Sequence, residues 1–167
     1  QLKEYVQRFG LQMRSANFGL YGDMSARVVE TLREFSRRIE VYSIDECFVD
    51  LTGMPELRSV SYAIHARIRS WVGIPVCVGI GPTKTLAKLA NQVAKKHPRS
   101  KGVFNFNDLS EDQKSRLLSQ WSVSEVWGVG RRLTSKLLTL IPIISTQEVC
   151  RSFDVKKATN KCGFFLS

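Results

Sequence analysis

Two adjacent carboxylates, Asp45 and Glu46, stand in the otherwise apolar stretch VYSIDECFVDLTG, residues 41–53. Carboxylate oxygens suit Mg²⁺, but neighbouring side chains of a continuous strand point to opposite faces of a sheet. Because Ser and Asp favour turns, we expect a tight turn over residues 43–46 that joins strands 39–42 and 46–51 into a hairpin. Both carboxylates would then lie at its tip and could hold a cation. The alternative is a surface hairpin with two solvated acids.

A row of lysines follows the next apolar strand. Residues 74–80, IPVCVGI, predict a buried strand, and the threonine after Gly-Pro can cap a helix over residues 83–96. At 100° per residue, Lys84, Lys88 and Lys95 fall within about 40° of one another on that helix. Such a row can face phosphate groups, with each lysine acting as a point charge. An ordinary amphipathic helix with a solvated lysine face is the alternative.

Glycines and cations combine in the segment WGVGRR, which links two predicted helical pieces. Gly128 and Gly130 permit a tight turn with positive φ. Backbone N–H groups exposed there, at the start of the next helix, can bind a DNA phosphate. Arg131, Arg132 and Lys136 would add attraction that is independent of base sequence and weakened by salt. An ordinary helical turn is the alternative.

The composition favours a polyanionic partner, since the formal net charge is +10. That partner could be nucleic acid or an anionic membrane surface, and no apolar run is long enough to span a bilayer. Its cysteines, Cys47, Cys77, Cys150 and Cys162, form no C-x-x-C pair. We therefore expect no zinc site, and reduced thiols in a cytoplasmic protein.

The pattern of elements predicts an α+β fold. Helices are expected over residues 23–38, 60–72 and 83–96, and strands over residues 39–42, 46–51, 74–80 and 102–106. This order matches part of a split βαβ sheet with helices on one face. Short helical segments follow at residues 110–119, 123–127 and 131–140. We predict a sheet domain over 1–108, a small all-helical domain over 109–141 and an atypical, poorly defined tail over 142–167.

Four segments resemble motifs of the Y-family, or translesion, DNA polymerases. YSIDECFVDLTG is similar to the second catalytic motif, in which S-I-D-E precedes an aromatic residue and an Asp. ANFGLYGDMSARVVETL resembles the segment that leads into the palm, and GIGPTKTLAKLANQVAKK resembles the palm helix. VWGVGRRLTSKL resembles the helix-hairpin-helix of the thumb. The likeness covers about residues 9–140, and it implies a partial ferredoxin-like palm followed by a thumb.

The resemblance implies template-directed nucleotidyl transfer with two Mg²⁺ ions in error-prone DNA repair and the SOS response. Asp45 and Glu46 would be the catalytic metal ligands, Lys95 would contact the nucleotide triphosphate, and the Gly128–Lys136 segment would bind DNA. Primer-template DNA and dNTP are the implied substrates. The implied protein partners are a UmuD-type accessory subunit, a RecA filament and a sliding clamp, although the clamp-binding region has no counterpart here.

Other family features also have no counterpart in this sequence. They are the third catalytic carboxylate on the first palm strand, the aromatic steric gate, the Tyr/Arg pair of the fingers and the little finger. We therefore expect an incomplete sheet with an exposed edge, marginal stability, and little or no polymerase activity of this chain alone. Two alternatives stay open: a non-catalytic DNA-binding module, and a palm-type nucleotidyl cyclase, against which the glycine segment and the charge argue.

Overall fold

The computed structural model describes residues 2–12, 14–140 and 162–166. Its α-helices are α1 (Leu2–Phe9), α2 (Phe18–Arg33), α3 (Leu57–Trp71), α4 (Lys84–Lys96), α5 (Glu111–Ser119) and α6 (Arg131–Leu140). Its strands are β1 (Ile39–Val41), β2 (Glu46–Val49), β3 (Val76–Ile80), β4 (Val103–Asn105) and β5 (Cys162–Leu166). Short 3-10 turns are η1 (Pro98–Ser100), η2 (Phe106–Asp108) and η3 (Val123–Glu125). The predicted α+β class is thus confirmed.

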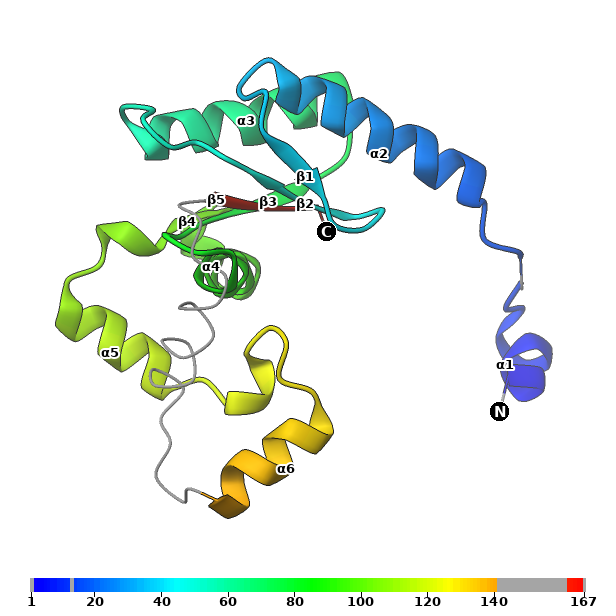
Figure 1. Ribbon diagram of the computed structural model, residues 1–167. Helices are drawn as coiled ribbons and strands as arrows, with labels where there is room; N and C mark the ends of the chain where they lie inside the picture. The colour runs from blue at the N-terminus through cyan, green and yellow to red at the C-terminus, as the bar shows by residue number, and fades with distance from the viewer. Residues whose placement is uncertain (1, 13, 141–161, 167) are drawn as a thin grey trace.

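The strands form one five-stranded sheet in the order β1-β2-β5-β3-β4. β5 pairs antiparallel with both β2 and β3, while β3 and β4 run parallel. The last strand of the chain therefore lies in the middle of the sheet (Figure 1). The outer strands of this sheet are β1 and β4, and the expected incompleteness of the sheet stays a prediction. The rest of the predicted tail, residues 142–161, lies outside the described residues.

Helices cover both faces of the sheet, not one face as predicted (Figure 1). Val78 of β3 is buried in a cluster with Leu32 of α2 and Ile64 of α3. The next residue, Gly79, faces α4, because a Cβ added there would lie 2.1 Å from the backbone nitrogen of Asn91. Because successive residues of a strand face opposite sides, α2 and α3 cover one face and α4 covers the other.

Local capping explains where the helices begin. Thr83 caps α4 as predicted, since its side chain accepts a hydrogen bond from the Leu86 N–H at 3.2 Å. α2 begins at Phe18, five residues before the predicted start, because Asn17 accepts a bond from the Leu20 N–H at 3.0 Å. Among the described residues, no helix has both the length and the apolar character needed to cross a membrane.

The helical segments after η2 pack against α4 rather than standing apart. Leu89 and Ala90 of α4 share a buried cluster with Leu118 of α5 and with Val126 and Val129. α5 begins with a capping box formed by Ser110 and Gln113. The division into domains at residue 108 stays a prediction.

Candidate catalytic site

The hairpin predicted around the two acids is present. β1 and β2 pair antiparallel, with Val41 opposite Cys47. The backbone N–H groups of Tyr42 and Ser43 both donate to the Glu46 carbonyl, at 2.9 and 3.0 Å. These bonds close the turn and place Asp45 within it, next to Glu46 at the first position of β2. The sequence thus predicted the position of both acids, whereas metal binding stays a prediction.

Asp45 and Glu46 lie in different surroundings. Asp45 is exposed, and its Oδ1 accepts a 2.6 Å hydrogen bond from the Ser43 hydroxyl. The Glu46 side chain is only 21% exposed and forms an ion pair with Lys88, with 3.2 Å between Nζ and Oε2. An ammonium group therefore already neutralises one of the two carboxylates.

The first half of the lysine row packs on the hairpin. The Lys88 side chain is 14% exposed, and that of Lys84 is 15% exposed and forms an ion pair with Glu40 of β1. Their ammonium groups also lie over aromatic rings, Lys84 over Phe48 at 5.2 Å and Lys88 over Tyr42 at 5.0 Å. The alternative of a solvated lysine face is therefore wrong for these two residues.

Lys95 lies at the same end of the sheet as the two acids. Asn91 of α4 donates to the carbonyl of Cys77, and Cys77 is level with Glu46 because both stand opposite residue 165 of β5. Lys95 follows Asn91 by about one helical turn, so it lies beyond the start of β3, toward the hairpin tip. Its predicted contact with a triphosphate is not tested by this placement.

Trp127 joins the helical segments to the hairpin and was not singled out as a site residue in the sequence. Its ring centroid lies 5.4 Å from that of Tyr42 and 5.7 Å from that of Phe48. Lys88 Nζ is also 5.0 Å from the Trp127 ring. An aromatic cluster of Tyr42, Phe48 and Trp127 therefore contacts the two lysines that pair with Glu40 and Glu46 of the hairpin.

The glycine segment precedes α6, with its cations outward. Gly128 has φ of +89°, but Gly130 does not have a positive φ, so only one of the two glycines is needed for the turn. The piece before the turn is the short η3 rather than the predicted helix over 123–127. Arg131, Arg132 and Lys136 are all exposed. The helix-hairpin-helix and its DNA contacts stay predictions.

A pocket of about 830 Å³ lies beside Asp45. Its other lining residues come from the start of α2, the hairpin turn and the segment before β3: Leu20, Tyr21, Met24, Ser25, Ile44, Ile74 and Pro75. The sequence motifs did not predict that these residues line a pocket. A usable signal was the apolar stripe of α2, which continues through Leu20 and Tyr21, about half exposed in the structure.

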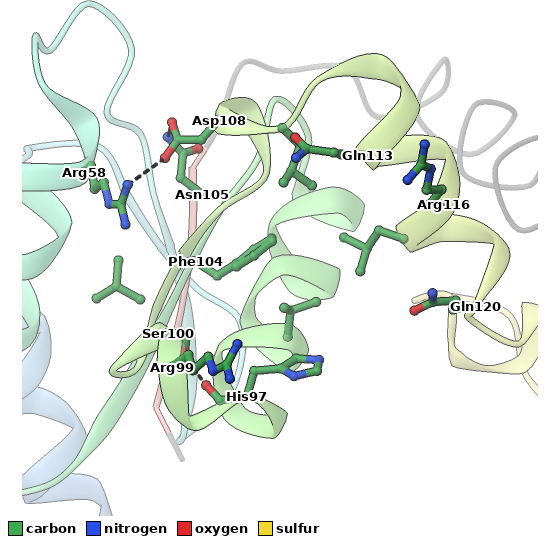
Figure 2. A pocket seen from close by; sticks show the side chains of 14 residues that line it. Arg58, His97, Arg99, Ser100, Phe104, Asn105, Asp108, Gln113, Arg116 and Gln120 are labelled. Carbon is green, nitrogen blue, oxygen red and sulfur yellow. Dashed lines mark hydrogen bonds and ion pairs between the residues drawn. The ribbon is translucent and has the colours of Figure 1, made fainter.

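A second pocket, of about 630 Å³, lies between the end of α4, β4 and α5 (Figure 2). Arg99 and His97 stand at one end of it, and Arg58 pairs with Asp108 at 3.9 Å at another. The described residues that line it include none of the predicted site residues. It is therefore separate from the hairpin acids.

The chain's own acids suit a cation only in part. Asp45 and Glu46 provide hard oxygen ligands, but among the described residues no three His, Cys, Asp or Glu side chains group to hold a metal. Asp50, the third acid of the signature, stands beyond the far end of β2. It accepts a bond from the Thr52 N–H at 3.0 Å and pairs with Arg38 at 3.3 Å. Asp50 therefore belongs to the base of the hairpin.

Residues 2–92 match the impB/mucB/samB family. The chain is 46% identical to Protein UmuC of Salmonella typhimurium over 142 residues, which are 83% of this chain and 33% of the relative. It is 35% identical to Protein MucB of Escherichia coli over 155 residues, 91% of this chain and 36% of the relative. DNA polymerase IV of Picrophilus torridus is 29% identical over 143 residues, 86% and 39% of the two chains.

Solved structures show a similar fold. An insertion ternary complex of Dbh DNA polymerase matches with a TM-score of 0.62 and 27% identity, over 84% of this chain and 40% of that chain. A DinB family error-prone DNA polymerase from Sulfolobus solfataricus matches with a TM-score of 0.65, over 93% and 51%. At 21% identity, the second likeness shows the fold alone.

The fold and these relatives place the chain among the Y-family DNA polymerases, as the sequence motifs predicted. The chain belongs to the impB/mucB/samB family. It spans about a third of the length of the curated relatives it matches.

Proposed function

We propose that this chain carries the carboxylate hairpin, the phosphate-facing helix end and part of the DNA grip of an error-prone, template-directed DNA polymerase. The observation that supports this most is the hairpin tip, where exposed Asp45 lines the 830 Å³ pocket and half-buried Glu46 is the next residue along the chain. A base and sugar could lie in that apolar pocket, with the phosphates directed toward Lys95.

In this proposal Asp45 and Glu46 hold the cation, and Lys95 binds the triphosphate. Bound Mg²⁺ would supply activation of the primer 3′-hydroxyl and stabilisation of the leaving pyrophosphate. When no cation is bound, Lys88 neutralises Glu46, because Lys88 Nζ lies 3.2 Å from Glu46 Oε2. Two acids give only part of a two-ion site, so we expect little or no nucleotide incorporation by this chain alone.

Thermal unfolding with Mg²⁺ and dNTP tests the proposed site, because a ligand that binds the folded state raises Tm. We expect Mg²⁺ and dNTP together to raise Tm for the unmodified chain. The shift should be lost in Asp45→Asn and Lys95→Ala and kept in the control Lys3→Ala, in exposed α1. An equal shift in all four proteins would contradict the site.

A second candidate is a non-catalytic DNA-binding module. It is favoured by the neutralisation of Glu46 by Lys88 and by exposed Arg131 and Arg132 at the start of α6. The double variant Arg131→Ala/Arg132→Ala should weaken duplex binding and reduce the slope of log affinity against log salt by about 2. The control Arg8→Ala/Arg14→Ala removes the same charge from another exposed region. Duplex binding without a Tm shift from Mg²⁺ and dNTP would select this candidate.

The family resemblance also predicts a role in the SOS response, with a UmuD-type subunit, a RecA filament and a sliding clamp as partners. These partners stay predictions. The cyclase alternative has no support among the relatives named above.

A further inference from the structure

Trp127 lies at the corner of a turn whose two ends are buried against α4. The Val129 N–H donates to the Val126 carbonyl at 2.9 Å, and Gly128 at the third position has φ of +89°, as in a type II turn. Val126 and Val129 are 3% and 6% exposed and share a buried cluster with Leu89 of α4. The backbone of this turn therefore restricts where the Trp127 ring can lie.

The Trp127 ring lies against the ammonium group of Lys88. Lys88 Nζ is 5.0 Å from the centroid of this ring and 5.0 Å from that of Tyr42, and it lies 3.2 Å from Glu46 Oε2. The Trp127 and Tyr42 rings meet edge to face, with their centroids 5.4 Å apart and an interplanar angle of 86°. Tyr42 belongs to the hairpin, whereas Trp127 belongs to the segment before α6. The contact between Trp127 and Lys88 therefore depends on how that segment packs on the sheet.

A ring that is fixed in place lowers the cost of keeping a lysine in one position. Lysine has a flexible four-carbon stem, and ordering such a side chain costs conformational entropy. The Lys88 side chain is only 14% exposed, and a cation–π contact is stronger where the ammonium group is removed from water. The Trp127 ring should therefore favour the position in which Lys88 neutralises Glu46. A divalent cation that binds the Glu46 carboxylate must displace this ammonium group.

A second cluster on α4 contains the same three residue types. Lys96 Nζ lies 4.3 Å from the centroid of the Trp121 ring and 3.1 Å from Glu125 Oε1. The Lys96 side chain is 56% exposed, and Glu125 belongs to η3 rather than to the hairpin. Trp121 is therefore a matched control for Trp127, because its ring contacts a lysine that pairs with a carboxylate away from the hairpin tip.

We propose that Trp127 is a positioning residue, which keeps the Lys88 ammonium group on Glu46 and thereby lowers the affinity of the hairpin tip for a divalent cation. The positioning of Lys88 follows from the contacts described above, whereas the effect on cation affinity rests on the proposed function. Trp127 acts through Lys88 in this arrangement, so its effect on cation binding should vanish when Lys88 is removed.

NMR of the Lys88 ammonium group in the intact chain tests the positioning directly. Hydrogens of this group exchange with water only when the group leaves its partners, so we expect an observable ¹⁵N–H signal, assigned by its loss in Lys88→Met. Trp127→Leu and Trp127→Met remove the ring but keep apolar bulk, and each should accelerate the exchange about threefold or more. Trp127→Phe should largely restore slow exchange. Unchanged exchange in either folded variant without the ring, or no signal in the unmodified chain, would overturn the positioning.

Mn²⁺ titration tests the consequence for the cation site. We expect Trp127→Leu to bind Mn²⁺ about three- to tenfold more tightly, and Trp127→Phe to stay within about twofold of the unmodified chain. The control Trp121→Leu should bind Mn²⁺ as the unmodified chain does. In the Lys88→Met background, Trp127→Leu should cause no further change, because groups that act through one another are not additive. An equal affinity in Trp127→Leu and the unmodified chain, or an effect of Trp127→Leu that persists without Lys88, would overturn the inference.

The failure of this inference and the failure of the proposed function give different results. Mn²⁺ binding that requires Asp45 and Glu46 but does not respond to Trp127→Leu would overturn the inference and leave the cation site supported. If none of the proteins binds Mn²⁺ but Trp127→Leu still accelerates exchange at Lys88, the cation site is contradicted and the positioning of Lys88 is supported.

Discussion

The two ends of β2 carry acids in contrasting settings. At the tip, Asp45 is exposed and accepts a bond from the Ser43 hydroxyl. At the base, the Asp50 side chain is 10% exposed and is held by Thr52 and Arg38. Hydrogen bonds from Thr52, with Arg38 nearby, lower the pKa of Asp50. One sequence signature thus contains an exposed acid at the hairpin tip and a buried acid that is held by the fold.

The backbone at the base explains this difference. The Asp50 N–H donates to the Arg38 carbonyl at 2.9 Å, and the Ser36 hydroxyl donates to the Asp50 carbonyl at 2.7 Å. The first bond extends the β1–β2 pairing beyond the strands themselves, and the second ties the residues before β1 to the same place. At four residues of about 3.3 Å each, the strand holds the two sets of acids roughly 13 Å apart, too far to share a metal ion.

Phe48→Ala should destabilise the tip and the base of the hairpin together. We expect it to have the largest effect on the free energy of unfolding. Phe48 is 1% exposed, lies in the middle of β2 and contacts Tyr42 and Trp127. We expect a loss of about 3–5 kcal/mol in the free energy of unfolding, measured by urea denaturation. The matched control Phe18→Ala, at a residue 74% exposed, should change stability little. Equal losses would contradict this packing.

Lys88→Met tests the ion pair between Lys88 and Glu46 at the hairpin tip. It leaves the half-buried Glu46 carboxylate without this ammonium partner, so we expect a stability loss of about 1–3 kcal/mol. It also removes a competing positive charge, so Mn²⁺ should bind several-fold more tightly. Lys96→Met is the control, because Lys96 pairs with Glu125 away from the hairpin. An unchanged Mn²⁺ affinity in Lys88→Met would show that Lys88 does not compete with the cation for the Glu46 carboxylate.

Asp50→Asn should affect stability at the base without affecting metal binding. We expect a loss of about 1 kcal/mol at pH 7. Because folding lowers the Asp50 pKa, the stabilisation is present above the unfolded-state value of about 4 and is lost as the pH falls through the folded-state value. The difference from the unmodified chain should therefore shrink in acid. A difference that is constant with pH would contradict this role, and Asp112→Asn, at an exposed position of α5, is the control.

Local chemistry made the tip predictable from the sequence. Ser43 and Asp45 are turn residues, so the hairpin follows from a few neighbouring positions, and Thr83 similarly marks the start of α4. The partners of Lys84 and Lys88 were not predictable, because Glu40 and Glu46 are more than 40 residues away in the chain. Helical periodicity shows that the lysines share a face, but not what that face contacts.

The strand β5 shows the limit of local patterns most clearly. Its five residues carry no periodic signal that distinguishes a strand from a tail, and their pairing depends on β2 and β3, more than 80 residues earlier. The prediction of helices on one face failed for a related reason. α4 packs on the second face because Gly79 leaves room for it, and that approach is visible only in three dimensions.

Mn²⁺ titration followed by electron paramagnetic resonance tests the central claim most directly, since Mn²⁺ shares the oxygen-ligand preference of Mg²⁺. The full chain is compared with Asp45→Asn, Glu46→Gln and Asp50→Asn. We predict about tenfold or greater weakening of Mn²⁺ binding in each of the first two variants and a change below about twofold in Asp50→Asn. Equal Mn²⁺ affinities in all four proteins, or a loss confined to Asp50→Asn, would contradict the assignment of the hairpin tip as the cation site.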